Sequence, residues 1–314
     1  MEVSLYILNI NFIMKFTNKI ILVLLFVFFL DFSVGKLLEF LYFKQSSGLF
    51  YRTTYSFNKA CESILVFGSS RANHHYYPTI FTEKFNTTFY NTGRDGNGIF
   101  FQYAVLKSVL KRYRPKLILL DYYGSFKYNQ SEYDKISSIL PYYNTNPEIR
   151  NIIYLKSPFE RIKLFSKIYP FNSKILTIMT GLFEFNKDRK KDFNGYVPLY
   201  GEWDKDIKYS TKSDSYIIDN NKVKIIKDFI ELCKINNVPL IIVYSPIYEK
   251  NANNKEISFI KNLAKKQNIQ FLDYSSDSIF LNNRTLFKDP THLNNKGAVL
   301  FSKMVTNKIN TNLK

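Results

Sequence analysis

The stretch Ser63-Ile-Leu-Val-Phe-Gly-Ser-Ser70 is a short apolar run that ends at a glycine and two serines. A run of this length, closed by a turn residue, is typical of a buried parallel strand. Similar runs follow at residues 87–90, 117–120, 240–244 and 269–272. Segments with helical spacing lie between them or after the last one, at residues 78–85, 98–113, 221–236, 257–267 and 295–309. Five strands separated by helices predict a mostly parallel sheet that is covered on both faces.

The alternation of strands and helices stops between residues 126 and about 215. This part of the chain is rich in Tyr, Phe and Lys. Because a structureless loop of this length is uncommon in a compact domain, we expect it to be a helical insertion that lies beside the functional site described below. Helices are expected at residues 148–156 and 158–167, and the apolar stretch 175–185 is expected to pack in the core.

The N-terminal segment predicts a membrane anchor. Residues 20–30 form an uninterrupted apolar run that extends to about Val34, and Lys15 and Lys19 precede it. A span needs roughly 20 apolar residues, and flanking apolar residues can lengthen this one. A cleaved signal peptide is the alternative, but no small-x-small cleavage site follows clearly. Translation from Met14 in place of Met1 is also compatible with this pattern.

These features predict three regions. Residues 1–43 are a tail and membrane anchor, residues 44–62 a linker, and residues 63–310 one domain with the insertion at about 126–215. The expected fold class is α/β, a flavodoxin-like three-layer sandwich with a mostly parallel five-stranded sheet, the helical insertion and the N-terminal membrane helix. We expect a single-pass protein of the cytoplasmic membrane whose domain lies outside the cytoplasm.

Composition limits the partners. Hydrophobic residues make up 46% of the chain, so global disorder is not expected. The formal net charge of +18 fits a polyanionic partner, but it also fits lysines spread over solvated helix faces. The charge is not clustered and no nucleic-acid-binding motif occurs, so no nucleic-acid partner is expected. Cys61 and Cys233 are expected to be small buried residues, and neither a metal nor a cofactor is expected.

Polar motifs follow several of the predicted strands. Ser70 follows the first strand, Gly96 the second and Ser125 the third, and His292 follows the fifth. Because the carboxyl ends of parallel strands meet at one edge of a sheet, these residues are expected to lie together. Asp289-x-x-His292 supplies an imidazole and a carboxylate to orient it, which a serine nucleophile requires. The candidate catalytic residues are therefore Ser70, Asp289 and His292.

These motifs resemble those of the SGNH (GDSL-like) hydrolase superfamily. Gly68-Ser69-Ser70 is similar to the Gly-Asp-Ser block, with Ser69 in place of Asp, and Asn91 with Gly96 is similar to the second block. Asp289-x-x-His292 followed by Leu293-Asn294 is similar to the last block. The resemblance implies that Ser70 is the nucleophile and that the N–H groups of Ser70 and Gly96 bind the oxyanion.

The third block departs from the family. The usual Gly-x-Asn-Asp is replaced by Asp121-Tyr-Tyr-Gly-Ser-Phe126, without the asparagine that donates to the oxyanion. Ser125 or Asn129 could substitute for it. Arg71 could hold an anionic substrate group or pair with a carboxylate. His74 and His75 could line the substrate cleft or lie exposed on the first turn of a helix.

Membrane-anchored proteins that resemble this chain include acetyl-transfer proteins of bacterial exopolysaccharides and the D-alanylation protein of teichoic acids. The resemblance implies a serine esterase or O-acyltransferase that acts on an acylated cell-surface glycan or a small ester. The third block favours an alternative, a catalytically weak binding or assembly component of a surface-polysaccharide pathway.

Overall fold

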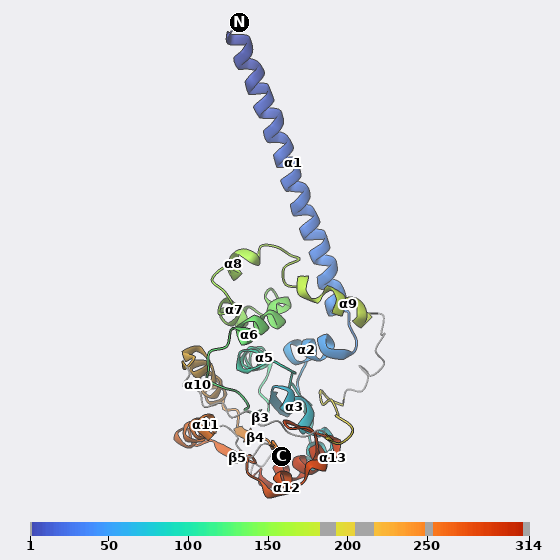
Figure 1. The fold of residues 1–314 in the computed structure, drawn as a ribbon, viewed down its shortest axis with the longest axis vertical. Helices are drawn as coiled ribbons and strands as arrows, with labels where there is room; N and C mark the ends of the chain where they lie inside the picture. Colours follow the sequence, from blue (N-terminus) through green and yellow to red (C-terminus); the bar gives the residue numbers. More distant parts are fainter. Residues whose placement is uncertain (1, 183–192, 205–216, 249–253, 310–314) are drawn as a thin grey trace.

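The structure, a computed structural model, describes residues 2–182, 193–204, 217–248 and 254–309 (Figure 1). Five strands form one sheet in which every neighbouring pair is parallel, in the order β2-β1-β3-β4-β5. Their bounds are β1 Ile64–Gly68, β2 Phe89–Asn91, β3 Leu117–Asp121, β4 Leu240–Tyr244 and β5 Gln270–Asp273. All five lie where the apolar runs predict them, and the α/β fold class is confirmed.

Strand side chains alternate between two separate cores, which makes the molecule a three-layer sandwich. Leu65, Phe67 and Ile118 belong to one core, and Ile64 and Val66 belong to the other. The first core is covered by α2 Gly48–Asn58, α5 Ile99–Arg112, α10 Asn220–Ile235 and α11 Asn254–Lys266. The second is covered by α3 Ser70–His75, α4 Pro78–Phe85, α12 Ser278–Leu281 and α13 Asn295–Lys308.

A small antiparallel pair of strands, β6 Phe287–Asp289 and β7 His292–Leu293, precedes α13. The sequence predicts a plain loop at residues 289–292, whereas Asp289 and His292 are paired directly across this ladder. Pro290 and Thr291 form the connection between the two strands. The 3-10 turn η5 Arg284–Leu286 leads into β6.

The N-terminal helix α1 runs without a break from Glu2 to Phe43 and extends away from the domain (Figure 1). Its residues Ile13–Phe43 are long and apolar enough to cross a membrane, and their most apolar stretch of 18 residues has a mean hydropathy of 2.4. Its last turns belong to the domain, because Leu38 and Tyr42 are buried in the first core. The Tyr42 hydroxyl lies 3.1 Å from that of Tyr142.

The linker predicted at residues 44–62 is in fact partly helical. The helix α2 buries Phe50 and Phe57, and the Phe57 ring stacks on Tyr142 at 4.3 Å between centroids. Its polar and apolar residues are mixed, and its packing against α5 and the insertion reveals that it belongs to the core. Cys233 is buried as expected, but Cys61 is exposed just beyond α2.

The described part of the insertion is a series of short helical turns. They are α6 Gln130–Asp134, η1 Lys135–Tyr142, η2 Pro147–Ile149, α7 Arg150–Tyr154, α8 Glu160–Lys163, η3 Asn172–Lys174 and α9 Ile175–Leu182. The prediction that the apolar stretch 175–185 packs in the core is confirmed only in part. Ile178 is fully buried, but Leu176 is 83% exposed, and residues 183–185 lie outside the described residues.

Candidate active site

The turn after β1 places Ser70 at the carboxyl edge of the sheet. Gly68 ends the strand, and a Cβ at this position would lie 2.6 Å from the Cβ of Ala72 and 2.8 Å from the carbonyl oxygen of Asp121. Only glycine therefore lets α3 start this close to the neighbouring strand β3. Ser70 is the first residue of α3 and is half-buried.

The turn between β6 and β7 fixes the histidine. Asp289 Oδ1 accepts hydrogen bonds from the backbone N–H groups of Thr291 at 2.9 Å and His292 at 3.0 Å. The Asn294 side chain, which follows β7, accepts from the N–H of Gly297 and so caps α13. The carboxylate and the imidazole are thus held by one short segment, as the Asp-x-x-His spacing predicts.

Ser70, His292 and Asp289 form a continuous hydrogen-bonded chain. His292 Nδ1 lies 2.8 Å from Asp289 Oδ2, and His292 Nε2 lies 2.7 Å from Ser70 Oγ. Because a carboxylate only accepts, Nδ1 carries the proton and Nε2 is free to accept the Ser70 proton. Burial acts to raise the pKa of Asp289, but the hydrogen bonds from His292 and Thr291 outweigh it and lower the pKa to about 2. The carboxylate is therefore ionised at neutral pH.

The segment 91–96 lies beside Ser70. Asn91 Oδ1 accepts from the N–H of Gly93 at 2.9 Å, and Asn91 Nδ2 donates to the carbonyl of Ala72 in α3 at 2.6 Å. Gly96 has a φ of +69°, a conformation that favours glycine. Within the described residues, the N–H groups of Ser70 and Gly96 have no hydrogen-bond acceptor. Both residues line the same pocket, so two backbone donors are available at this edge.

Arg71 does not line the pocket. It is 1% exposed and pairs with the buried carboxylate of Asp121 at 3.2 Å. The Tyr123 and Tyr244 rings lie on it, with their centroids at 4.2 and 4.4 Å from Cζ. Of the two alternatives for Arg71, the structure shows the pairing with a carboxylate.

His74 and His75 are neither exposed nor part of the pocket wall, which corrects both expectations. His74 Nδ1 donates to the carbonyl of Val197 at 2.7 Å, and its Nε2 lies 3.2 Å from Asp95 Oδ1. His75 Nδ1 lies 3.0 Å from Ser245 Oγ, and its Nε2 accepts from the N–H of Leu293. Both rings pack edge-on against the His292 ring, with centroids at 5.6 Å for His74 and 6.3 Å for His75.

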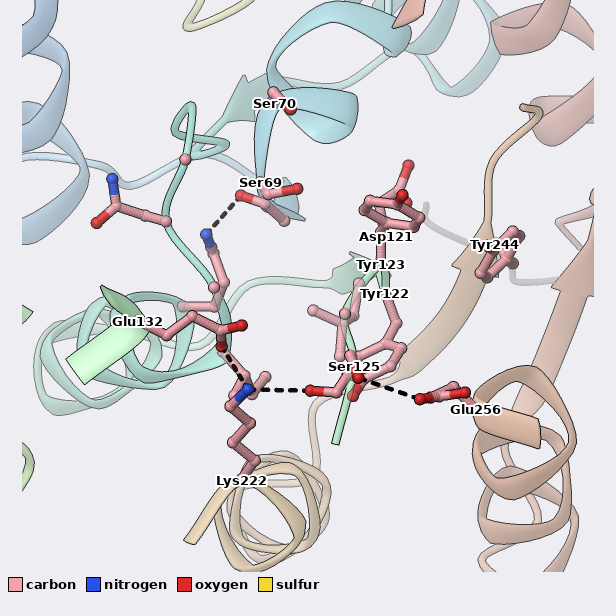
Figure 2. Close-up of a pocket in the computed structure, with 18 of the residues that line it drawn as sticks. Ser69, Ser70, Asp121, Tyr122, Tyr123, Ser125, Glu132, Lys222, Tyr244 and Glu256 are labelled. Carbon is pink, nitrogen blue, oxygen red and sulfur yellow. Dashed lines mark hydrogen bonds and ion pairs between the residues drawn. The ribbon is translucent and has the colours of Figure 1, made fainter. Parts of the chain in front are cut away.

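A cavity of about 400 Å³ opens beside Ser70 (Figure 2). The exposed surface of its walls is more apolar than polar, and the polar side chains that line it include Glu132, Ser125, Lys222 and Glu256. The buried ammonium of Lys222 contacts Glu132 at 2.8 Å and the Ser125 carbonyl at 3.0 Å. Ser125 Oγ donates to Glu256 at 3.2 Å, at the end of the cavity away from Ser70 in Figure 2. Asn129 is exposed and caps α6, so neither side chain faces Ser70 in this structure.

Among the described residues, no group of three or more His, Cys, Asp or Glu side chains could hold a metal ion. No protein-family model matches the chain, and no curated protein matches it in sequence. Solved structures resemble it in fold. One is a candidate acylhydrolase from Bacteroides fragilis NCTC 9343, with 14% sequence identity and a TM-score of 0.41, covering 80% of this chain and 88% of that one. This similarity is too low to bear on activity.

Several residues that support the site were not identified from the sequence. Asp95 Oδ1 accepts from Asn73 Nδ2 at 2.7 Å and thereby ties the loop of Gly96 to α3. Gln102 Nε2 donates to the carbonyl of Gly68. The position of Asp95 directly before Gly96, in the segment that resembles the second block, is a sequence signal that points to a role at the site. Gln102 is one polar residue on the buried face of a helix, and only the fold shows what it contacts.

Proposed function

We propose that this protein is a serine-dependent ester hydrolase or O-acyltransferase that works through an acyl-serine intermediate. The observation that carries the proposal is the 2.7 Å contact between His292 Nε2 and Ser70 Oγ, with the Asp289 carboxylate on the other ring nitrogen. A nucleophile, a base and an orienting group within hydrogen-bonding distance of one another are the arrangement that acyl transfer requires.

The proposed reaction has two halves. Ser70 Oγ attacks the acyl carbonyl and gives its proton to His292 Nε2, and the leaving alcohol then takes that proton as the ester bond breaks. The N–H groups of Ser70 and Gly96 receive the negative charge on the carbonyl oxygen. In the second half, His292 takes a proton from water or from a sugar hydroxyl, which attacks the acyl-serine and releases Ser70.

The proposed substrate is an acylated glycan or a small ester outside the cytoplasm. Two features support it. The cavity beside Ser70 measures about 400 Å³ and combines apolar walls with polar side chains such as Glu132 and Lys222, which suits a short acyl group on a polar molecule. The helix α1 is apolar and long enough to tether the domain to a membrane.

A second candidate is a binding or assembly component with the same fold. The observation that favours it is the engagement of Ser125 Oγ by Glu256, which leaves two backbone donors at the oxyanion position. Loss of one donor typically slows acyl transfer by about 100- to 1000-fold. This candidate predicts a folded protein that binds a surface polymer and turns over no ester.

Steady-state kinetics with an aryl acetate and with acetylated glycans separate the two candidates. In the full chain we expect Ser70→Ala to reduce kcat by roughly 10⁴-fold or more and His292→Ala by a similar factor, because the three residues act as a unit. Adding a sugar acceptor distinguishes transfer from hydrolysis. Equal rates in wild type and Ser70→Ala, or no turnover by folded wild type, would rule out the esterase.

A further inference from the structure

The insertion exposes large apolar side chains at one end of the domain. On and around α8, Phe159 is 62% exposed, Ile162 67% and Phe165 79%. On α9, Leu176 is 83% exposed and Met179 40%. We call these five side chains the apolar end surface. Single exposed apolar residues are ordinary, but several at the same end of a domain mark a candidate contact with a membrane or a partner.

This surface belongs to the part of the domain that contacts α1. Asp31 of α1 accepts hydrogen bonds from Ser166 Oγ at 2.5 Å and from the N–H of Lys167 at 2.7 Å. One turn further along α1, a Cβ on Gly35 would lie 2.4 Å from Lys167, so the two backbones are in direct contact. Figure 1 shows α8 and α9 at the end of the domain from which α1 leaves.

The length of α1 places this junction at a membrane surface. Residues 13–30, which precede Asp31, are exposed along the whole helix. Residues 20–30 are all apolar, and the polar residues before them are Lys15, Thr17, Asn18 and Lys19. At a rise of about 1.5 Å per residue, residues 13–30 span about 27 Å. The hydrocarbon core of a bilayer is about 30 Å thick. If these residues fill the hydrocarbon, Asp31 and the segment bound to it lie in the headgroup region.

The charges around the apolar end surface fit that environment. Arg161 is exposed between Phe159 and Ile162, and its guanidinium lies 4.6 Å from the centre of the Tyr154 ring. The carboxylate of Glu160 is buried and bound by Lys156 and Lys163, so no free negative charge arises from it. Basic and aromatic residues beside exposed apolar ones are typical of segments that lie in the interface of a bilayer.

We propose that the apolar end surface is embedded in the headgroup region of the same bilayer that α1 crosses. The occupant of this surface is lipid, and the contact holds the domain in one orientation rather than letting it swing on α1. Ser70 lies on α3, away from this end of the domain in Figure 1. The proposal does not depend on the chemistry at Ser70.

Tryptophan quenching by brominated lipid tests this directly. The full chain is reconstituted into phosphatidylcholine vesicles with bromine on the acyl carbons nearest the headgroup, as wild type and as Phe165→Trp or Leu176→Trp. The native Trp203 is buried, and its signal is subtracted. Phe26→Trp in α1 is the positive control, and Ile279→Trp on α12, at the opposite end of the domain, is the matched exposed control.

We expect brominated lipid to quench the tryptophans at positions 165, 176 and 26 and to leave the one at position 279 unchanged. Quenching at position 26 alone would mean that the domain stands clear of the bilayer, and the proposal fails. Absence of quenching at position 26 would mean that α1 does not insert into the bilayer. Equal quenching at position 279 would mean that the protein adsorbs to the vesicles nonspecifically. Each of these results overturns the proposal.

Discussion

The three histidines of the chain meet in one cluster, yet their hydrogen-bond partners differ. His292 presents a free Nε2 to Ser70. Both nitrogens of His74 face acceptors, the carbonyl of Val197 and the carboxylate of Asp95. His75 accepts from a backbone N–H and must stay neutral. Burial, with the nearby Arg71 and His292, lowers the pKa of His75 well below its usual value.

The low pKa of His75 predicts a pH-dependent stability. Below pH 6.5 the unfolded chain takes up a proton at His75, whereas the folded chain does not. The contribution of His75 to the free energy of unfolding is therefore fully present above pH 6.5 and is lost as the pH falls. The slope contributed by one such group approaches about 1.4 kcal/mol per pH unit. In urea unfolding of the full chain in detergent between pH 7.5 and 5, we expect His75→Gln to show a shallower dependence than wild type. Parallel curves would contradict this.

At the scale of elements, the site is an assembly of three turns around α3. The turn after β1 starts this helix, the turn after β2 is bound to it through Asn91, and the β6–β7 turn brings His292 to its first residue. Asp95 adds a second tie, because its carboxylate accepts from Asn73 and faces His74, both on α3. Gly96 follows directly, so the position of its N–H depends on this contact.

We therefore predict that Asp95→Ala lowers kcat for an aryl acetate by roughly 10- to 100-fold, because a displacement of about 1 Å can cost that much. KM should change little, since Asp95 does not line the cavity. Asp95→Asn keeps an acceptor for Asn73 and should retain most of the rate. The control is Glu83→Ala, which removes an exposed carboxylate from α4. A loss that appears only in KM, or equally in Glu83→Ala, argues against a positioning role.

The elements differ in how well the sequence predicts them. The five strands are found within two residues of their predicted bounds, because each is an apolar run closed by a turn residue. The proximity of Ser70, Asp289 and His292 follows from the rule that strand ends share an edge. The burial of His74 and His75 does not follow, because it is created by Val197 and Ser245, which are distant in sequence. The role of α2 is not predicted either, because the burial of Phe50 and Phe57 depends on packing against elements that are distant in sequence, such as Tyr142.

At the scale of the whole molecule, α1 is long and apolar enough to cross a membrane, and its last turns are also part of the domain. Its apolar run is recognisable in the sequence, whereas the burial of Leu38 and Tyr42 at its end depends on packing against α2 and the insertion. The anchor and the domain therefore join without a free linker. This rigid junction is what makes a fixed orientation on a membrane possible.

The two cysteines offer a test of the side on which the domain lies. Cys61 is exposed and Cys233 is buried, with a pKa that burial raises to about 12, so a thiol reagent reports on Cys61. If the domain lies outside the cytoplasm, we expect a membrane-impermeant maleimide to modify Cys61 in intact spheroplasts and not to modify the Cys61→Ser variant. Modification only after lysis would place the domain inside.

Covalent labelling by a fluorophosphonate tests the central claim, that His292 activates Ser70 as a nucleophile. The Ser70 oxygen attacks phosphorus and fluoride leaves, so the adduct marks the reactive serine by mass spectrometry. We predict an adduct on Ser70 in the wild-type full chain, retention of that adduct in Ser69→Ala, much slower labelling in His292→Ala, and none in Ser70→Ala. Labelling that persists in folded Ser70→Ala, or is absent from folded wild type, would contradict the account.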